Sequence, residues 1–180
     1  MLNHDLEVTP RMPTSSVFRI PVTSLLRRPG ASRTAQVEGT LADIRGPGAE
    51  VGDEQPIAVD LTLERVSEGI VVRGSVATRW EAACSRCLVP VGDDLVVHVG
   101  ELYERNPLEG ETYPLSDDDI VDLEPLIRDA LLLELPAVPL CRPDCQGLCP
   151  SCGVDHNLTS CDCSDAEPDP RWDALRSLDL

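Results

Sequence analysis

The cysteines are the residues of this 180-residue sequence whose type and spacing could do chemistry. All eight fall into four close pairs: Cys84 and Cys87, Cys141 and Cys145, Cys149 and Cys152, and Cys161 and Cys163. Thiolates bind soft metal ions, and a structural zinc site takes four ligands at the corners of a tetrahedron. A CxxC turn places two sulfurs on one side of the ion, and a distant pair completes the site. Four pairs therefore predict two Zn²⁺ ions, each held by four cysteines.

Spacing favours one assignment of these pairs to the two predicted zinc sites. The last four cysteines lie within fifteen residues of one another, so they can close one site locally. They are Cys149, Cys152, Cys161 and Cys163, and the remaining four are Cys84, Cys87, Cys141 and Cys145. Gly153 follows Cys152 directly, and its missing side chain lets the backbone bend so that amide groups point at the thiolates. Spacing alone leaves open which pairs share an ion.

Two other interpretations concern residues within these groups. His156 lies in the loop of the local site and has a ring that commonly binds metals, but the cysteines already fill both sites, so a surface position is expected. The Cys84-Ser85-Arg86-Cys87 turn could instead be redox-active, because an adjacent arginine lowers the pKa of a thiol. A thioredoxin-like CxxC begins a helix after a strand. Here the turn lies between two strand-like segments, which argues against that role.

The segments that must position the first cysteines have the pattern of strands. Hydrophobic and polar residues alternate over 57–64 and again over 70–80, which predicts a β-hairpin. A further apolar run covers 95–102. Cys84 and Cys87 are therefore expected in a turn between two strands.

A helix is expected to lead into the second half of the cysteines. Residues 103–119 are acidic and without periodicity, which predicts a mobile loop. Apolar residues then recur at helical spacing over 119–135, with the acids at 117–119 as N-cap and first-turn charges. Pro136 ends this helix. The pattern predicts an α+β fold: a strand-rich antiparallel core, one principal helix and a Cys-rich zinc-binding C-terminal segment.

The expected organisation along the chain has four parts. Residues 1–16 form a disordered N-terminus, 17–140 the α+β core, 141–165 the zinc-binding tail and 166–180 a short C-terminal helix. The closing helix is suggested by Asp169 as N-cap and Pro170 at its first position.

Charge restricts the functions open to this sequence. It has 32 acidic residues against 15 arginines and no lysine, for a formal net charge of −17. Such a charge repels nucleic acid and anionic membranes and favours basic proteins as partners. No P-loop or GxGxxG motif occurs, so neither a nucleotide cofactor nor a small-molecule substrate is expected. No signal-like or membrane-spanning apolar run is present, so we expect a cytoplasmic protein whose cysteines are not disulfide-bonded.

One segment is an exception to the acidic composition. Residues 8–37 contain five arginines and no acid, and their VFRIPV stretch at 17–22 has a strand-like pattern. The candidate RNA contacts are Arg19, Arg27, Arg28 and Arg33. The alternative is that these arginines only balance the acids of the protein itself.

Four motifs together resemble one bacterial family. They are the FRIPV…LxRRPG opening, the Cys84-x-Arg86-Cys87-Leu88 turn, the DLEPLIRDALLLELPAVPLC stretch and the CxGLCPSCG…N…CDC tail. Over residues 17–165 the sequence is similar to the YceD-like proteins, the large ribosomal RNA subunit accumulation proteins. The resemblance implies a role in the accumulation or maturation of 23S ribosomal RNA.

The motifs and the resemblance together predict a non-enzymatic zinc-binding factor for large ribosomal subunit biogenesis. The expected partner is a precursor of the large subunit, contacted through a basic ribosomal protein, through 23S rRNA, or through both. No catalytic residues are predicted, because a catalytic zinc keeps one position open for water and a site with four cysteines does not. The alternatives are a metal-dependent or redox RNA-processing enzyme, and a zinc-ribbon interaction module for another basic partner.

Overall fold

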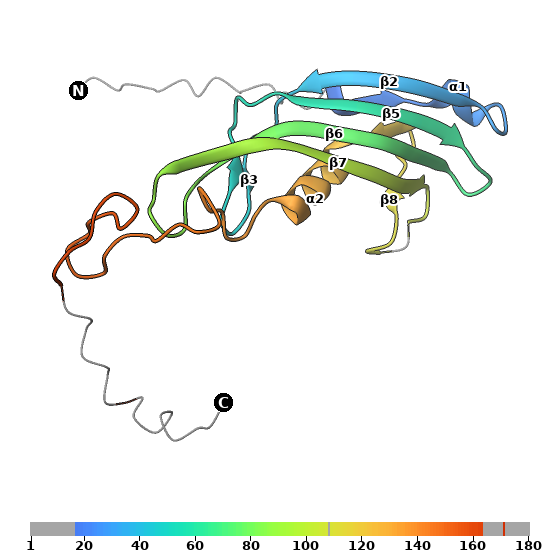
Figure 1. Cartoon of the computed structure of the whole chain (residues 1–180). Helices are drawn as coiled ribbons and strands as arrows, with labels where there is room; N and C mark the ends of the chain where they lie inside the picture. Colours follow the sequence, from blue (N-terminus) through green and yellow to red (C-terminus); the bar gives the residue numbers. More distant parts are fainter. Residues whose placement is uncertain (1–16, 108, 164–170, 172–180) are drawn as a thin grey trace, which may run out of the picture.

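A long antiparallel sheet dominates the computed structural model, which describes residues 17–107, 109–163 and 171 (Figure 1). Its seven strands are β2 (Ser32–Gly39), β3 (Ile44–Arg45), β4 (Glu50–Val51), β5 (Ile57–Arg65), β6 (Ile70–Ala83), β7 (Pro90–Glu104) and β8 (Tyr113–Pro114). The order β2-β5-β6-β4-β3 forms one path, and β7 pairs with the whole length of β6 along its other edge. Among the strands that the structure describes, only β8 runs parallel to its neighbour.

Alternating side chains explain why β5 and β6 form the centre of this sheet. In β5 the residues Ile57, Val59, Leu61 and Leu63 are buried, and the polar residues between them are exposed. This period of two puts one face toward the core and the other toward solvent. The predicted hairpin is confirmed.

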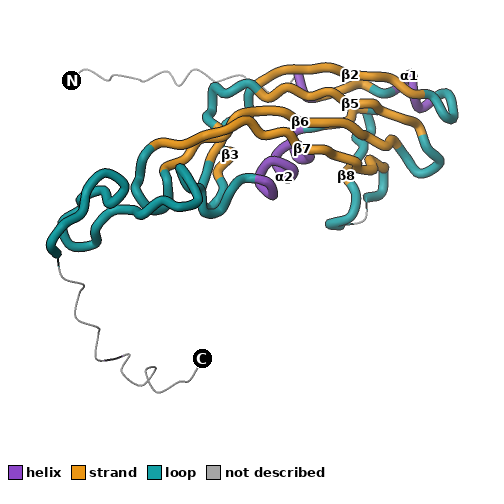
Figure 2. Tube along the Cα trace, in the orientation of Figure 1, coloured by secondary structure: helices purple, strands orange, loops and turns teal. Residues whose placement is uncertain are grey.

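The β6–β7 hairpin is longer than the apolar pattern predicts. Its register runs from Ile70 opposite Tyr103 to Ala83 opposite Pro90, so pairing continues through the polar residues at 92–94. Backbone pairing does not require apolar side chains once the register is set by the buried part of the hairpin. The result is an arm that carries its turn beyond the main body of the protein (Figure 2).

The principal helix covers one face of the sheet. Helix α2 (Glu124–Glu134) buries Leu126, Ile127 and Leu131 against the core. A two-stranded sheet of β1 (Arg19–Pro21) and β9 (Ile120–Asp122) lies next to the short helix α1 (Thr23–Leu26). The predicted α+β class, strand-rich and antiparallel with one substantial helix, is confirmed.

The helix begins later than predicted, and the acids at 117–119 do not cap it. Its N-cap is Leu123, which makes no side-chain cap hydrogen bond, and Asp122 Oδ1 accepts from the Glu124 N–H at 3.1 Å instead. The preceding residues form β9, where Val121 pairs with Ile20 and is fully buried. Pairing with a strand about a hundred residues earlier overrides the helical periodicity.

The predicted acidic loop contains a tertiary anchor. Tyr113 stacks on Tyr103 with ring centroids 5.2 Å apart, and its hydroxyl donates to Asp129 at 2.7 Å. The Tyr103 hydroxyl donates to the Asp122 carbonyl at 3.0 Å. These contacts tie β7 and β8 to β9 and to α2.

The predicted N-terminal segment 1–16 lies outside the described residues, as does most of the predicted closing helix at 166–180. Within the described residues, no helix has both the length and the apolar character needed to span a membrane.

Candidate metal centres

The β6–β7 arm ends in the first cysteine turn. The Cys84 N–H donates to the Val89 carbonyl at 2.8 Å, and the Leu88 N–H donates to the Cys84 carbonyl at 2.9 Å. Leu88 closes the turn with a φ of 62°. The Ser85 N–H donates to the Pro139 carbonyl at 2.8 Å, which joins the turn to the chain beyond α2. The turn therefore lies between two strands, as predicted.

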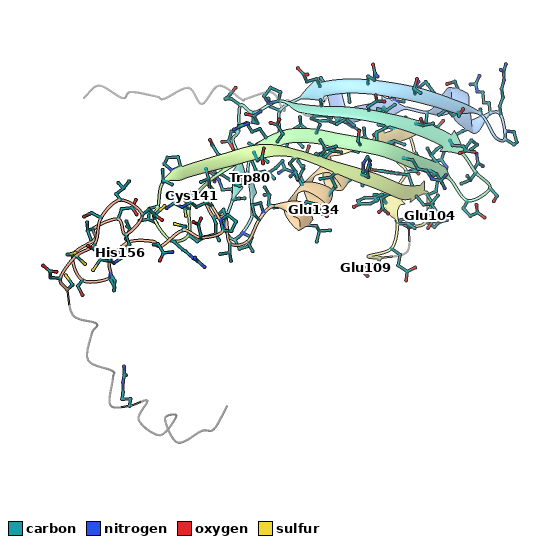
Figure 3. All side chains as sticks on the ribbon, viewed as in Figure 1. Trp80, Glu104, Glu109, Glu134, Cys141 and His156 are labelled. Carbon is teal, nitrogen blue, oxygen red and sulfur yellow. The ribbon has the colours of Figure 1, made fainter. Side chains whose placement is uncertain are left out.

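Cys141 and Cys145 complete the first cluster of sulfurs. The Sγ atoms of Cys84, Cys87, Cys141 and Cys145 all lie within 4.8 Å of one another. Cys84 and Cys145 are separated by 3.9 Å between sulfurs, and Cys87 and Cys141 by 3.6 Å. A tetrahedral zinc with four bonds of 2.3 Å requires sulfurs about 3.8 Å apart. The first cluster therefore fits zinc in donor type and in spacing, and Figure 3 shows Cys141 at the end of the arm.

The second cluster repeats this turn. The Cys149 N–H donates to the Val154 carbonyl at 2.8 Å, and the Gly153 N–H donates to the Cys149 carbonyl at 2.9 Å. Gly153 has a φ of 75°. We call the two turns, 84–89 and 149–154, the first and second knuckle. The sulfurs of this cluster, from Cys149, Cys152, Cys161 and Cys163, also lie within 4.8 Å of one another.

The thiol pKa values differ sharply within each cluster. In the first knuckle the backbone N–H of Cys87, followed by that of Arg86, lowers the pKa of Cys84 to about 6. Desolvation, followed by the hydrogen bond with Cys145, raises the pKa of Cys141 to about 12. Cys84 thus loses its proton readily, whereas Cys141 resists becoming a further negative charge in the same cluster. A divalent cation removes that obstacle, which is the electrostatic reason such a cluster suits a metal.

The second cluster shows the same electrostatic pattern. The backbone N–H groups of Cys152 and Ser151 lower the pKa of Cys149 to about 6. Hydrogen bonds with Cys152 and then Cys161 raise the pKa of Cys163 to about 12. The predicted bending of the knuckle, with amide groups directed at a thiolate, is present.

Asn157 links the two clusters, a role that the sequence does not predict. It belongs to the loop of the second cluster, yet its Nδ2 donates to the sulfur of Cys145 in the first cluster, at 3.4 Å. Its Oδ1 accepts from the Gln146 N–H at 2.8 Å and from Arg142 at 2.7 Å. The only sequence signal is its place in the tail motif, because a loop asparagine is otherwise common.

Arg86 makes a second link between the arm and the tail. Its guanidinium donates to the Cys145 carbonyl at 2.7 Å, and its own carbonyl accepts from the Leu148 N–H at 3.1 Å. Gly147 has a φ of 75°, and a Cβ there would lie 3.1 Å from the Arg86 carbonyl oxygen. The side chain of Arg86 is thus used in holding two segments together. We call the first knuckle and residues 136–163 the cysteine lobe.

His156 lies outside both sulfur clusters. His156 is exposed, and its backbone N–H donates to the Gly147 carbonyl at 2.9 Å. In Figure 3 it lies further from the sheet than Cys141. This is the surface position that the sequence predicts for His156.

The candidate RNA-contacting arginines are not brought together with the cysteines. Arg19 lies 3.8 Å from a carboxylate oxygen of Asp122, and Arg33 donates to the Pro21 carbonyl at 3.1 Å. Arg27 and Arg28 are exposed at the end of α1 and make no side-chain hydrogen bond or ion pair with the described residues. Helix α1 lies at the opposite end of the sheet from the cysteine lobe (Figure 1).

Comparison with known proteins supports the resemblance stated above. The family model described as large ribosomal RNA subunit accumulation protein YceD matches residues 72–179, a range that contains every cysteine. An uncharacterised protein of Mycobacterium tuberculosis is 36% identical over 177 residues, which cover 89% of this chain and 81% of the relative. The uncharacterised protein YlbN of Bacillus subtilis is 27% identical over 123 residues, which cover 66% of this chain and 69% of the relative.

A plant protein extends the comparison. The large ribosomal RNA subunit accumulation protein YCED homolog 1, chloroplastic, of Zea mays is 24% identical over 184 residues, covering 83% of this chain and 62% of the relative. No solved structure matches. The family model spans more than half of this sequence, and the chain belongs to the YceD family.

Proposed function

We propose that this protein is a non-enzymatic zinc-binding factor that supports accumulation of 23S rRNA during large ribosomal subunit biogenesis. The observation that carries the proposal is the coincidence of two features in one segment. The family match covers residues 72–179, and both four-sulfur clusters lie inside it. Family membership implies a role in accumulation of the large ribosomal RNA, and the clusters supply a metal-stabilised lobe for that role.

The ligand sets support a structural metal over a catalytic one. A catalytic zinc has three protein ligands and a water in the fourth position. Each cluster here offers four thiols within 4.8 Å of one another, which fill a tetrahedron. The first cluster also joins the arm to the chain beyond α2, so its ion would hold distant segments together. Such binding energy contributes directly to folding.

Complementation in cells tests the proposed role. Cells that lack the protein should accumulate less 23S rRNA relative to the small-subunit RNA, and the wild-type gene should restore the ratio. Cys87→Ser and Cys152→Ser, which each remove one thiolate, should fail to restore it. Ser151→Ala is the matched control, because Ser151 lies in the second knuckle without donating a sulfur. Full restoration by the double cysteine variant would overturn the role of the metals.

Two measurements on the purified protein test the metal and the absence of catalysis. Elemental analysis should give about two zinc ions per chain, because the sulfurs form two separate tetrahedra. Cys87→Ser and Cys152→Ser should each lose one of them, and equal loss of both in each variant would mean that the ligands are mixed. Cleavage of 23S precursor by the zinc-loaded protein alone would overturn the non-enzymatic proposal.

A further inference from the structure

Leu88 has an unfavourable backbone conformation. The turn requires this conformation at position 88, but it does not require the residue to be leucine. Its φ is 62°, in the left-handed region, where the Cβ of any residue other than glycine crowds the following carbonyl oxygen. The two knuckles make the same pair of backbone hydrogen bonds, and the equivalent position in the second knuckle is Gly153. Glycine adopts this conformation without steric cost. The first knuckle could therefore close equally well, and with less strain, around a glycine.

The Leu88 side chain does not compensate for this strain inside the molecule. It is 64% exposed and is not part of the hydrophobic core. Its backbone N–H donates to Cys84, a bond that any residue except proline could make. Strained residues that persist in a fold cluster at functional contacts. Within the described residues, the core therefore gains nothing from the leucine side chain that offsets this strain.

Other exposed apolar residues lie next to Leu88. Val89 follows it and is 46% exposed, and Val138 is 69% exposed. Val138 lies near the first knuckle, because the carbonyl of the next residue, Pro139, accepts the hydrogen bond from the Ser85 N–H. We call Leu88, Val89 and Val138 the knuckle tip. Neighbouring exposed apolar side chains indicate contact with another protein, and they offer nothing to a phosphate.

Charge identifies the chemistry of the partner. The chain has a net charge of −17, and the arm below the knuckle carries exposed acids at Glu81 and Asp93, whereas its third acid, Asp94, forms an ion pair with Arg79 at 3.2 Å. The nearby Arg86 keeps its positive charge, but its guanidinium is directed at the Cys145 carbonyl and therefore at the cysteine lobe. A zinc ion bound by the four thiolates of the first cluster would add a net charge of about −2 beside the tip. An apolar contact within a negative field attracts a basic protein and repels RNA.

We propose that the knuckle tip binds a basic protein of the large-subunit precursor, with Leu88 as its central contact. This inference rests on the proposed function, because that function supplies the precursor as the partner. Leu88 enters an apolar site on the basic protein, and the acids of the arm face its cationic side chains.

Site-specific photo-cross-linking tests which molecule the tip contacts. A photoreactive phenylalanine analogue replaces Leu88 in the zinc-loaded full chain, which is mixed with isolated large-subunit precursor particles. The control position is Val96, which is 60% exposed on β7 and lies roughly 20 Å from the end of the arm along the strand. Position 88 should cross-link to a basic ribosomal protein that position 96 does not reach. A cross-link from position 88 to rRNA, or identical products from both positions, would overturn the inference.

Binding of variants to the same particles separates contact from folding. Leu88→Gly relieves the strain, so it should keep both zinc ions and melt at a temperature no lower than that of the wild type, while binding at least tenfold more weakly. Leu88→Asn, which also tolerates a positive φ, should behave in the same way. Val96→Ala should bind as the wild type does. Wild-type affinity in Leu88→Gly would overturn this inference alone, whereas failure of the wild-type protein to bind the particles would overturn the proposed function as well.

Discussion

Asn157 shows how one side chain can couple two metal sites. Its amide donates to a sulfur of the first cluster, while its backbone lies in the loop closed by the second. A hydrogen bond to a thiolate spreads its negative charge and fixes the orientation of the ligand. Closure of the second cluster should therefore strengthen metal binding by the first.

Asn157→Ala should weaken zinc binding by the first cluster about tenfold, because outer hydrogen bonds to ligands contribute that much to affinity. Competition with a chelator should show zinc leaving the protein in two steps. The step that is missing in Cys87→Ser is the release of zinc from the first cluster. Thr159→Ala is the control, because Thr159 lies in the same loop and its hydroxyl donates to the Ser160 carbonyl, not to a sulfur. An unchanged first step, or an equal shift of both steps, would contradict the coupling.

The knuckle residues Leu88 and Gly153 give a second prediction at this scale. Leu88→Gly should be about 1 kcal/mol more stable than Leu88→Ala, because alanine retains the left-handed strain and glycine does not. Gly153→Ala should be less stable than the wild type by a similar free energy of unfolding, because alanine is strained at this positive φ. Urea unfolding of the zinc-loaded variants measures both differences. Equal stability of the two Leu88 variants would show that the position carries no strain.

At the scale of elements, the β6–β7 arm determines where the first knuckle lies. The arm is held by continuous pairing from Ile70 opposite Tyr103 to Ala83 opposite Pro90. The chain beyond α2 returns to the arm past Gly48, where a Cβ would lie 2.2 Å from the Ala137 carbonyl oxygen. Only glycine permits this close approach. The first cluster thus closes a contact that the sheet and the helix have already prepared.

Tyr103 anchors the base of the arm and gives a prediction about pH. Burial, followed by the charge of Tyr113, raises the pKa of Tyr103 above its ordinary value. A raised folded-state pKa gives stability that is fully present below the unfolded pKa of about 10 and is lost as pH rises above it.

Tyr103→Phe should therefore flatten the loss of stability at alkaline pH. At about pH 7 the variant should be about 1 kcal/mol less stable, because it lacks the hydrogen bond to the Asp122 carbonyl. Between about pH 9 and about pH 11 it should lose less free energy of unfolding than the wild type. Urea unfolding at each pH measures both effects. Parallel decline of the two proteins would mean that Tyr103 does not control the alkaline transition.

At the scale of the whole molecule, acidic charge and exposed arginines lie in different places. The net charge is −17, yet Arg27 and Arg28 are exposed at the end of the sheet opposite the cysteine lobe. A basic protein partner at the knuckle tip does not need these arginines. An RNA partner at α1 would need them.

Reversal of Arg27 and Arg28 to Glu should leave the salt dependence of binding to precursor particles unchanged. Two phosphate contacts would contribute a slope of roughly −1.4 to −1.8 in log affinity against log salt. Loss of that slope in the double variant would show that this segment binds rRNA. Zinc content is the control, because the cysteines lie elsewhere in the fold.

The sequence by itself determined the features that depend on short spacing. Cysteine pairs two to four residues apart indicated the two clusters, and alternation over 57–64 indicated the central hairpin. The motifs around Cys84 and Cys149 were enough to indicate the family. These features follow from the local geometry of turns and strands, so a linear pattern records them.

Only the tertiary structure decided the features that depend on distant contacts. Residues 120–122 form a strand because β1 pairs with them, although their pattern continues that of the helix. Asn157 is brought to Cys145, and Leu88 is revealed as the counterpart of Gly153, by hydrogen bonds that no periodicity encodes. Long-range pairing selects among conformations that are locally of similar free energy, and the sequence leaves no local trace of that selection.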